Sequence, residues 1–299
     1  MAIAEDQLDV WAKLGPTGLL SETYNSIRST LMDSRSPFYF RSFDDVYLQG
    51  SYGNNTNVRV DSDVDLVLCT SDTWHYDLDH LSADQRQKFQ QDITDVTSVG
   101  PPFKQEVTGW LNSQYGAEIV DPQHKAIKLK GNDYRKPADI LVCTEHRQYF
   151  SYNGNFDAGH HKGVRFFAPD GTSIVNFPKL HAEACTEKHQ ATNSQFKPTV
   201  RIFKNMRNRM IERGIIANGL APSYYIECAL WNVPNSTFSY YYNATVPNCL
   251  EWLRLSDRQK LLCANQRRWL LRNGRPDAWI PADFENFLAK AIKFWTDGG

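Results

Sequence analysis

Long hydrophobic runs, closely paired cysteines and an excess of one charge are all missing from this sequence. No apolar stretch approaches the roughly 20 residues of a membrane-spanning helix, so we expect no membrane partner. The six cysteines show no C-x-x-C spacing, which argues against a zinc site or a disulfide framework and indicates reduced, buried thiols. The formal net charge is only -1, which argues against stable binding to duplex nucleic acid.

The N-terminal segment also lacks the pattern of a secretory signal. Glu5, Asp6 and Asp9 place acidic residues where such a signal is basic and then apolar. Together with the unpaired cysteines, this pattern predicts a protein of the reducing cytoplasm.

The pattern of hydrophobic residues changes near Pro178. Its 299 residues suffice for one large or two ordinary domains, and its 41% hydrophobic residues suffice for a full core. Up to Pro178 short extended segments alternate with helical patterns, whereas nearly every later segment has helical periodicity. We therefore predict an α+β fold, with a mixed domain over residues 1–178 and an α-helical lobe over residues 179–299. The predicted helices of the lobe span residues 179–190, 198–213, 222–231, 247–255, 257–273 and 281–296.

The first half carries recognisable start and turn signals. Ser21 and Ser82 are predicted N-caps of two helices, the second spanning residues 83–95. Pro169-Asp170-Gly171 predicts a hairpin turn between two strands. His160 and His161 lie in a glycine-containing stretch that we expect to be a loop.

The most informative stretch runs from Leu48 to Leu68. Gly50 and Ser51 follow a short predicted strand, and glycine there would let the backbone approach a phosphate closely. The segment D-V-D-L-V-L then alternates carboxylates with apolar residues. In a strand, Asp63 and Asp65 would therefore share one face.

Asp139 opens a second apolar run, Ile140 to Cys143. If this strand lay beside the strand that begins at Asp63, three carboxylates would converge, and their repulsion would require a cation. Hard oxygen ligands favour Mg²⁺ or Mn²⁺. Each feature alone also fits a plain structural reading, namely a solvated strand face or an ordinary turn. Their joint order favours metal-dependent chemistry on a nucleoside triphosphate.

The order of these features resembles the polymerase-β type of nucleotidyltransferase, and nearly the whole chain resembles the bacterial cGAS/DncV-like nucleotidyltransferases (CD-NTases). Three motifs carry this resemblance. Q-G-S-Y-G-N at residues 49–54 is similar to the family's phosphate turn. F-K-P-T-V-R-I-F-K-N at 196–205 is similar to its helix that presents a lysine to the triphosphate, and A-P-S-Y-Y-I-E at 221–227 is similar to its Ser-Tyr motif.

The resemblance implies roles for individual residues. Asp63 and Asp65 would bind two Mg²⁺ or Mn²⁺ ions, and Asp139 would complete the site of the ion that activates the sugar hydroxyl. Gly50 and Ser51 would hold the β- and γ-phosphates. The residues expected to bind the nucleotide are Gln49, Gly50, Ser51, Arg201, Lys204, Ser223 and Tyr224.

Within that set, Lys204 and Ser223 would contact the triphosphate from the helical lobe, and Tyr224 would stack on a base. Lys197, Arg201 and Lys204 form one stripe of a predicted helix. Such a stripe is a sensible triphosphate clamp, although a basic helix face is commonly just solvated.

The predicted function is the synthesis of a cyclic di- or trinucleotide from nucleoside triphosphates, with an active site between the two lobes and pyrophosphate as the second product. The resemblance implies a second messenger of anti-phage (CBASS-type) signalling. One alternative is a transferase that makes linear oligonucleotides or modifies a small acceptor. Another is a nucleotide-binding protein without catalysis, which the three intact carboxylates argue against.

Two further expectations follow from the family. His189 lies where the family often has Lys-Asn and where a residue influences base choice, so the nucleobases stay open. Some relatives are conjugated through a terminal glycine by ubiquitin-transfer-like enzymes. Gly299 could serve such a partner, or it could be a frayed end.

Overall fold

The computed structural model describes residues 3–58, 63–93 and 100–299, and it divides the chain into two compact units. Unit 1 comprises Met1–Thr17, Gln49–Ser62 and Lys179–Gly299, and unit 2 comprises Gly18–Leu48 and Asp63–Pro178.

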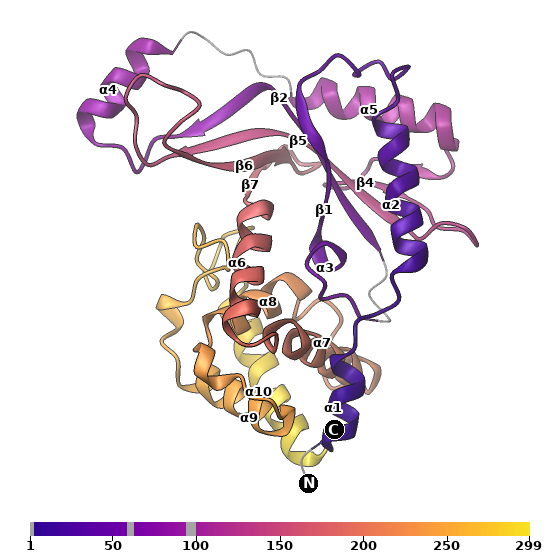
Figure 1. Ribbon diagram of the computed structural model, residues 1–299, viewed down its shortest axis with the longest axis vertical. Helices are drawn as coiled ribbons and strands as arrows, with labels where there is room; N and C mark the ends of the chain where they lie inside the picture. The colour runs from indigo at the N-terminus through magenta and orange to yellow at the C-terminus, as the bar shows by residue number, and fades with distance from the viewer. Residues whose placement is uncertain (1–2, 59–62, 94–99) are drawn as a thin grey trace. The chain divides into compact units, whose positions relative to one another are not determined.

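Unit 2 is built on a seven-stranded mixed sheet with helices beside it (Figure 1). Its helices are α2 (Gly18–Leu31), α4 (Ala83–Asp92) and α5 (Gly100–Tyr115). Its strands are β1 (Phe43–Gln49), β2 (Val64–Asp77), β3 (Val120–Asp121), β4 (Ile127–Leu129), β5 (Ala138–Tyr149), β6 (His160–Phe167) and β7 (Ser173–Asn176).

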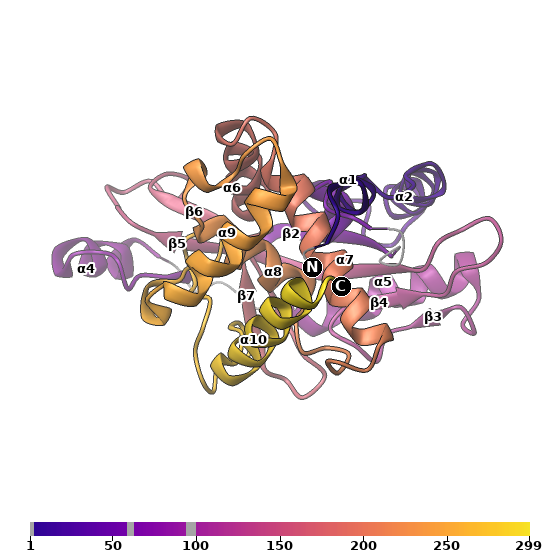
Figure 2. The same ribbon diagram turned by 90° about the horizontal axis from the view of Figure 1, so that it is seen from below.

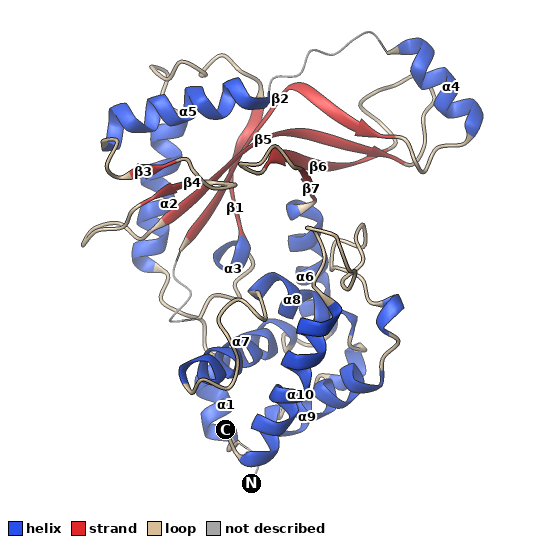
Figure 3. Cartoon of the chain, turned by 180° about the vertical axis from the view of Figure 1, so that it is seen from behind, coloured by secondary structure: helices blue, strands red, loops and turns tan. Residues whose placement is uncertain are grey.

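Strand β5 is the centre of this sheet. It pairs in parallel with β2 along one edge, from Val64↔Ala138 to Asp77↔Gln148. Along its other edge it pairs antiparallel first with β4 and then with β6. Figure 3 shows β2, β5 and β6 side by side, with α4 beyond one end of the long strands and α5 near the other. Val64, Leu66, Val67 and Leu68 are all buried, as expected for a central strand covered on both faces.

Unit 1 is helical. Its helices are α1 (Glu5–Ala12), α3 (Gly50–Gly53), α6 (Pro178–Ala191), α7 (Phe196–Glu212), α8 (Ser223–Asn232), η1 (Asn235–Thr237), α9 (Tyr242–Leu255), η2 (Arg258–Lys260) and α10 (Pro281–Asp297). Figure 2 shows α9 and α10 lying side by side. The apolar side chains of α7 recur every three or four residues, for example Val200, Phe203 and Met210, and this stripe is buried in the core of the unit.

Two early segments group with the helical second half of the chain. The boundary after Pro178 coincides with a boundary of the compact units, but Met1–Thr17 and Gln49–Ser62 group with the helical unit. The reason is side-chain bonding from α7: Asn205 Nδ2 donates to the Trp11 carbonyl at 2.9 Å, and Arg201 Nε donates to the Ala12 carbonyl. Contacts between residues so far apart in the sequence leave no periodic signal.

The α+β fold class is confirmed, but the predicted helix over residues 257–273 is wrong. The structure has only the short turn η2 there, followed by irregular chain with bridges Leu262↔Trp269 and Leu271↔Trp279. Leu270 accepts a backbone hydrogen bond from Trp279 at 2.8 Å. Pairing with a later segment therefore replaces the helical hydrogen bonds in this stretch.

Three other predicted boundaries also differ. Helix α9 begins at Tyr242, with Pro247 inside it, because the Glu5 carboxylate accepts the N–H groups of Tyr242 and Asn243 and caps the helix. Helix α2 begins at Gly18, so Ser21 lies inside it. His160 and His161 open strand β6, since they pair with Tyr149 and Gln148.

One predicted cap and the predicted hairpin of unit 2 are confirmed. Ser82 Oγ accepts the Gln85 N–H at 3.3 Å at the start of α4. Strands β6 and β7 form the predicted hairpin, with Gly171 at φ +84° in its turn. All six cysteines are unbridged thiols. None of the helices in the described ranges combines the length and apolar character that a bilayer span requires.

Two glycines of unit 2 provide a matched test of how tightly β6 packs. A Cβ on Gly163 of β6 would lie 2.7 Å from the Asn176 carbonyl oxygen and 2.8 Å from the Phe177 ring, whereas a Cβ on Gly109 of α5 would meet nothing within 4 Å. We expect Gly163→Ala to lower the free energy of unfolding by about 1–3 kcal/mol through overpacking. Gly109→Ala should raise it by about 0.5–1 kcal/mol. Urea unfolding followed by circular dichroism measures both, and equal effects would contradict this account of β6.

Candidate active site

The three predicted carboxylates lie at the start of two neighbouring strands of unit 2. Asp65 of β2 and Asp139 of β5 are direct partners in the parallel ladder, so their side chains point to the same face of the sheet. Asp63 directly precedes β2, two residues before Asp65, and it is exposed. The pairing of the Asp63–Cys69 segment with the Asp139 strand is therefore present as expected.

A cation already faces this group. Lys128 of β4 is the partner of Asp139 on its other edge, and Lys128 Nζ lies 3.7 Å from Asp139 Oδ2. A set of carboxylate oxygens on one face fits a hard divalent cation such as Mg²⁺ or Mn²⁺. The exposed ammonium of Lys128 contributes little by itself to holding these charges together.

The predicted phosphate turn belongs to unit 1. Gln49 ends β1, and Gly50 begins the one-turn helix α3 with φ +65°, a conformation that favours glycine. The chain then folds back on itself, because Thr56 N–H donates to the Ser51 carbonyl at 2.9 Å and Asn54 N–H donates to the Gly50 carbonyl at 3.1 Å. Ser51 is thus held in a closed loop.

Two residues of the basic stripe on α7, Lys204 and Arg201, are buried and bonded to this turn. Lys204 has no exposed surface, and its Nζ donates to the Thr56 carbonyl at 2.9 Å. Arg201 Nη1 donates to the Asn55 carbonyl at 2.6 Å, and burial lowers the pKa of Arg201 to about 10. Contact of Lys204 or Arg201 with a triphosphate stays a prediction. In the structure these two side chains donate to backbone carbonyl groups.

Ser223 and Tyr224 open helix α8. Arg207 Nη1 donates to Ser223 Oγ at 3.1 Å and so brings a buried cation to this hydroxyl. The Tyr224 ring stacks on the His181 ring, with centroids 4.8 Å apart and an interplanar angle of 28°. Burial raises the pKa of the Tyr224 phenol well above its ordinary value. One face of Tyr224 is therefore already covered by an imidazole.

Glu227 is the residue that sequence reasoning missed. This residue is only 2% exposed. Its carboxylate accepts from Asn54 Nδ2 at 3.0 Å, from His181 Nε2 at 2.9 Å and from Thr56 Oγ1. Glu227 closes the motif A-P-S-Y-Y-I-E, so a signal was present, but a glutamate in a helix is ordinarily exposed.

The charge on Glu227 is stabilised by these partners. Burial alone would raise the pKa of this carboxyl, but the hydrogen bond from His181, the charges of His181 and Lys204 and the hydroxyl of Thr56 together lower it. An ionised carboxylate can only accept hydrogen bonds, so His181 Nε2 carries the proton in this pairing.

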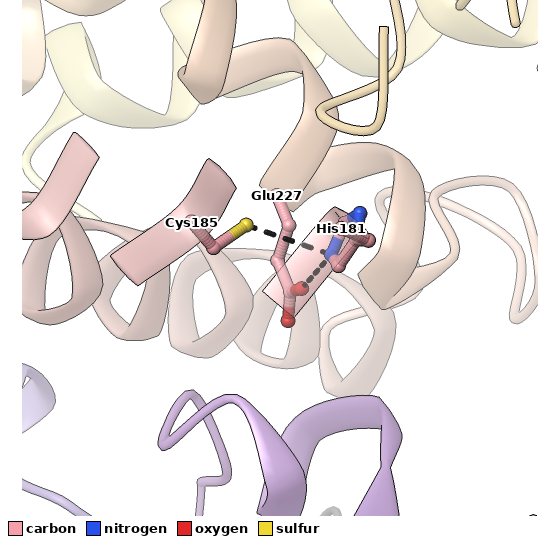
Figure 4. Close-up of side chains that lie close together, drawn as sticks. All are labelled: His181, Cys185 and Glu227. Atoms are coloured by element: carbon pink, nitrogen blue, oxygen red, sulfur yellow. Dashed lines mark hydrogen bonds and ion pairs between the residues drawn. The ribbon is translucent and has the colours of Figure 1, made fainter. Parts of the chain in front are cut away.

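Figure 4 shows that His181, Cys185 and Glu227 cluster, and their ligand atoms all lie within 4.8 Å of one another. Such a trio could in principle hold a metal ion. Both Glu227 oxygens already accept hydrogen bonds, however, and burial raises the pKa of the Cys185 thiol well above its ordinary value, which disfavours the thiolate. We therefore read this trio as a hydrogen-bonded cluster.

A cavity of about 860 Å³ lies elsewhere in unit 2. It is lined by α5, β5 and the β6–β7 hairpin, with Phe103, Val142 and Phe166 among its apolar residues. Asp63, Asp65 and Asp139 do not line it. The carboxylate site is therefore distinct from this cavity.

Comparisons with known proteins find relatives along the whole chain. Residues 183–296 match the cGAS/DncV-like nucleotidyltransferase C-terminal helical domain. The chain is 35% identical over 300 residues to the cyclic UMP-AMP synthase of Rhodothermus marinus, covering 100% of each chain. It is 33% identical over 303 residues to the cyclic nucleotide synthase CdnE01 of Staphylococcus haemolyticus, covering 99% and 100%. The solved structure of the Rhodothermus marinus CdnE c-UMP-AMP synthase with Apcpp and Upnpp superposes with a TM-score of 0.87, over 99% of this chain and 98% of that one.

The lowered pKa of Glu227 predicts a pH-dependent contribution to stability. The folded state favours the ionised carboxylate, so this contribution is present above the ordinary pKa of 4.5 and is lost as the pH falls through the lower folded value. At pH 7, Glu227→Gln should lower the free energy of unfolding by about 1–3 kcal/mol. The difference in free energy of unfolding between wild type and variant should stay constant down to about pH 5.5 and narrow as the pH falls below 4.5, as measured by urea unfolding.

A surface carboxylate serves as the control for this measurement. Glu212 pairs with Arg209 at an exposed site, where the two side chains are 53% and 50% exposed. Glu212→Gln should change stability little at any pH. A wild-type curve that runs parallel to that of Glu227→Gln would contradict an ionised, stabilising Glu227.

Proposed function

This chain belongs to the cGAS/DncV-like nucleotidyltransferase family, and we propose that it joins nucleoside triphosphates into a cyclic oligonucleotide. The observation that carries the proposal is the register of Asp65 with Asp139 on adjacent parallel strands, with Asp63 two residues ahead. Each new phosphodiester bond would form by in-line attack of a ribose hydroxyl on an α-phosphate, with pyrophosphate as the leaving group.

The three carboxylates are the proposed ligands of two Mg²⁺ or Mn²⁺ ions. When bound, such ions lower the pKa of the attacking hydroxyl and neutralise charge on the leaving group. The chain itself contributes binding and orientation. Backbone N–H groups at Gly50 and Ser51 would hold the β- and γ-phosphates. Ser223 would contact the triphosphate, and Tyr224 would stack on a base.

The relatives guide the choice of substrates to test. A relative that is 35% identical over the whole chain is named for a cyclic product of UMP and AMP, so ATP and UTP form the first pair. A cyclic trinucleotide is the larger product of the same chemistry. The proposed role of the product is that of a second messenger in anti-phage (CBASS-type) signalling in the cytoplasm.

Product analysis tests the proposal. Purified protein is incubated with the four labelled nucleoside triphosphates, each omitted in turn, with Mg²⁺ or Mn²⁺ and with a chelator as the blank. We expect a phosphatase-resistant product whose mass identifies the bases. Asp65→Asn and Asp139→Asn should each reduce its formation by at least about 100-fold, because each removes charge from the reacting centre. Asp79→Asn, an exposed carboxylate after β2, should have no effect.

Other products would support the other candidates. Linear products alone would favour an oligonucleotide synthase or a transferase to a small acceptor. Absence of pyrophosphate release with every divalent cation would favour a nucleotide-binding protein without catalysis.

We also propose Gly299 as the attachment point for a ubiquitin-transfer-like partner. Gly299 N–H donates to the Phe294 carbonyl at 2.9 Å, and a Cβ on Gly299 would lie 3.0 Å from Ile3 Cγ1. Conjugation would therefore require this end of α10 to open. Deleting Gly299 should abolish the conjugate in cells that carry such an enzyme, as seen by immunoblot; a conjugate that persists would overturn the proposal.

A further inference from the structure

We infer that Glu227, held by His181, is the positioning residue that fixes the phosphate-binding turn for the triphosphate. The inference rests on the proposed function and extends it to a residue outside the expected nucleotide contacts. Its basis is a chain of hydrogen bonds within unit 1 that leads from a buried carboxylate to Ser51.

The first step of that chain is the carboxylate itself. Glu227 accepts hydrogen bonds from the side chains of Asn54 and Thr56, the first and third residues after α3. A hydrogen bond to a charged acceptor is about twice as strong as one between neutral groups. Asn54 and Thr56 are themselves 5% and 0% exposed, so water cannot replace the carboxylate.

The second step links Thr56 to the phosphate residue. Thr56 N–H donates to the Ser51 carbonyl at 2.9 Å, and Lys204 Nζ donates to the carbonyl of Thr56 at 2.9 Å. Thr56 is therefore held at its hydroxyl, its N–H and its carbonyl. Asn55, between the two anchored residues, has φ +55°, and its carbonyl accepts from Arg201. This arrangement of the segment satisfies all of these donors at once.

The third step is the hydrogen bond by which His181 holds Glu227 in place. His181 Nε2 donates to the same Glu227 oxygen that accepts from Asn54. His181 is 4% exposed, and its imidazole contacts both Glu227 and the Tyr224 ring. Glu227 therefore cannot turn away from the turn without losing the bond to His181. Lys204 and Arg201 of α7 thus bind carbonyl groups of the turn, and Glu227 of α8 binds its side chains. The N–H groups at Gly50 and Ser51 are the proposed contacts of the phosphates.

A pair of Thr56 variants tests this inference. Thr56→Val keeps the shape of the side chain but loses the hydroxyl that donates a hydrogen bond to Glu227. Thr56→Ser keeps this hydroxyl. Binding of a non-hydrolysable ATP analogue and of AMP is measured by calorimetry with Mg²⁺. We expect Thr56→Val to lower the affinity for the ATP analogue about tenfold. The affinity for AMP should fall less than about twofold, because AMP lacks the β- and γ-phosphates that the turn would hold. Thr56→Ser should restore the wild-type ratio.

A buried hydroxyl elsewhere in unit 1 provides the matched control. Thr245 of α9 is 0% exposed and bonds to Ser239. Thr245→Val should lower the melting temperature without changing the ratio of ATP-analogue to AMP affinity. Glu227→Gln should change that ratio in the same direction as Thr56→Val. If Thr56→Val does not fold, Asn54→Ala, which removes the other side chain bound by Glu227, gives the same readout.

The outcomes separate the inference from the proposed function. A wild-type protein that binds no ATP analogue overturns the proposed function, and the inference with it. A wild-type protein that binds the analogue, with Thr56→Val or Glu227→Gln losing ATP and AMP affinity equally or not at all, overturns the inference alone.

Discussion

The parallel pairing of β2 with β5 is the constraint on which the proposed chemistry depends. Parallel ladders keep neighbouring side chains on the same face, so one register brings Asp65 beside Asp139. A slip of one residue would turn one carboxylate to the opposite face and separate the metal ligands. The burial of Leu66, Val67 and Leu68 on both faces of β2 makes such a slip costly. The apolar residues of the strand thus specify the position of its polar ones.

Unit 1 shows a second use of buried charge. Three charged side chains would each be costly to bury alone: Lys204, Arg201 and Glu227. Each is stabilised by a hydrogen bond to the segment after α3. The result is a short turn held by charged side chains from two helices. A turn that presents N–H groups to a highly charged ligand must resist movement when that ligand binds. Bonds to ionised groups provide such resistance.

Local features of the sequence predicted local structure well. The period-two pattern from Asp63 predicted β2, Ser82 predicted the start of α4, and Pro169-Asp170-Gly171 predicted the β6–β7 hairpin. Prediction failed where distant segments supply the hydrogen bonds. Glu5 caps α9 several residues before Pro247, and Trp279 pairs with Leu270 where a helix was expected. Neither partner leaves a trace in the sequence around the element that it alters.

The sequence by itself determined the candidate site's chemistry: which residues carry carboxylates, where glycine permits the turn, and which faces are apolar, since these follow from residue type and short-range spacing. The tertiary structure alone decided which β-strands are neighbours, and therefore that Asp65 and Asp139 are partners. It also decided that Lys204 and Arg201 bond to the turn and that Glu227 is buried. The reason is that a charged side chain on a helix has no preferred partner until the fold brings a carbonyl or a carboxylate within reach.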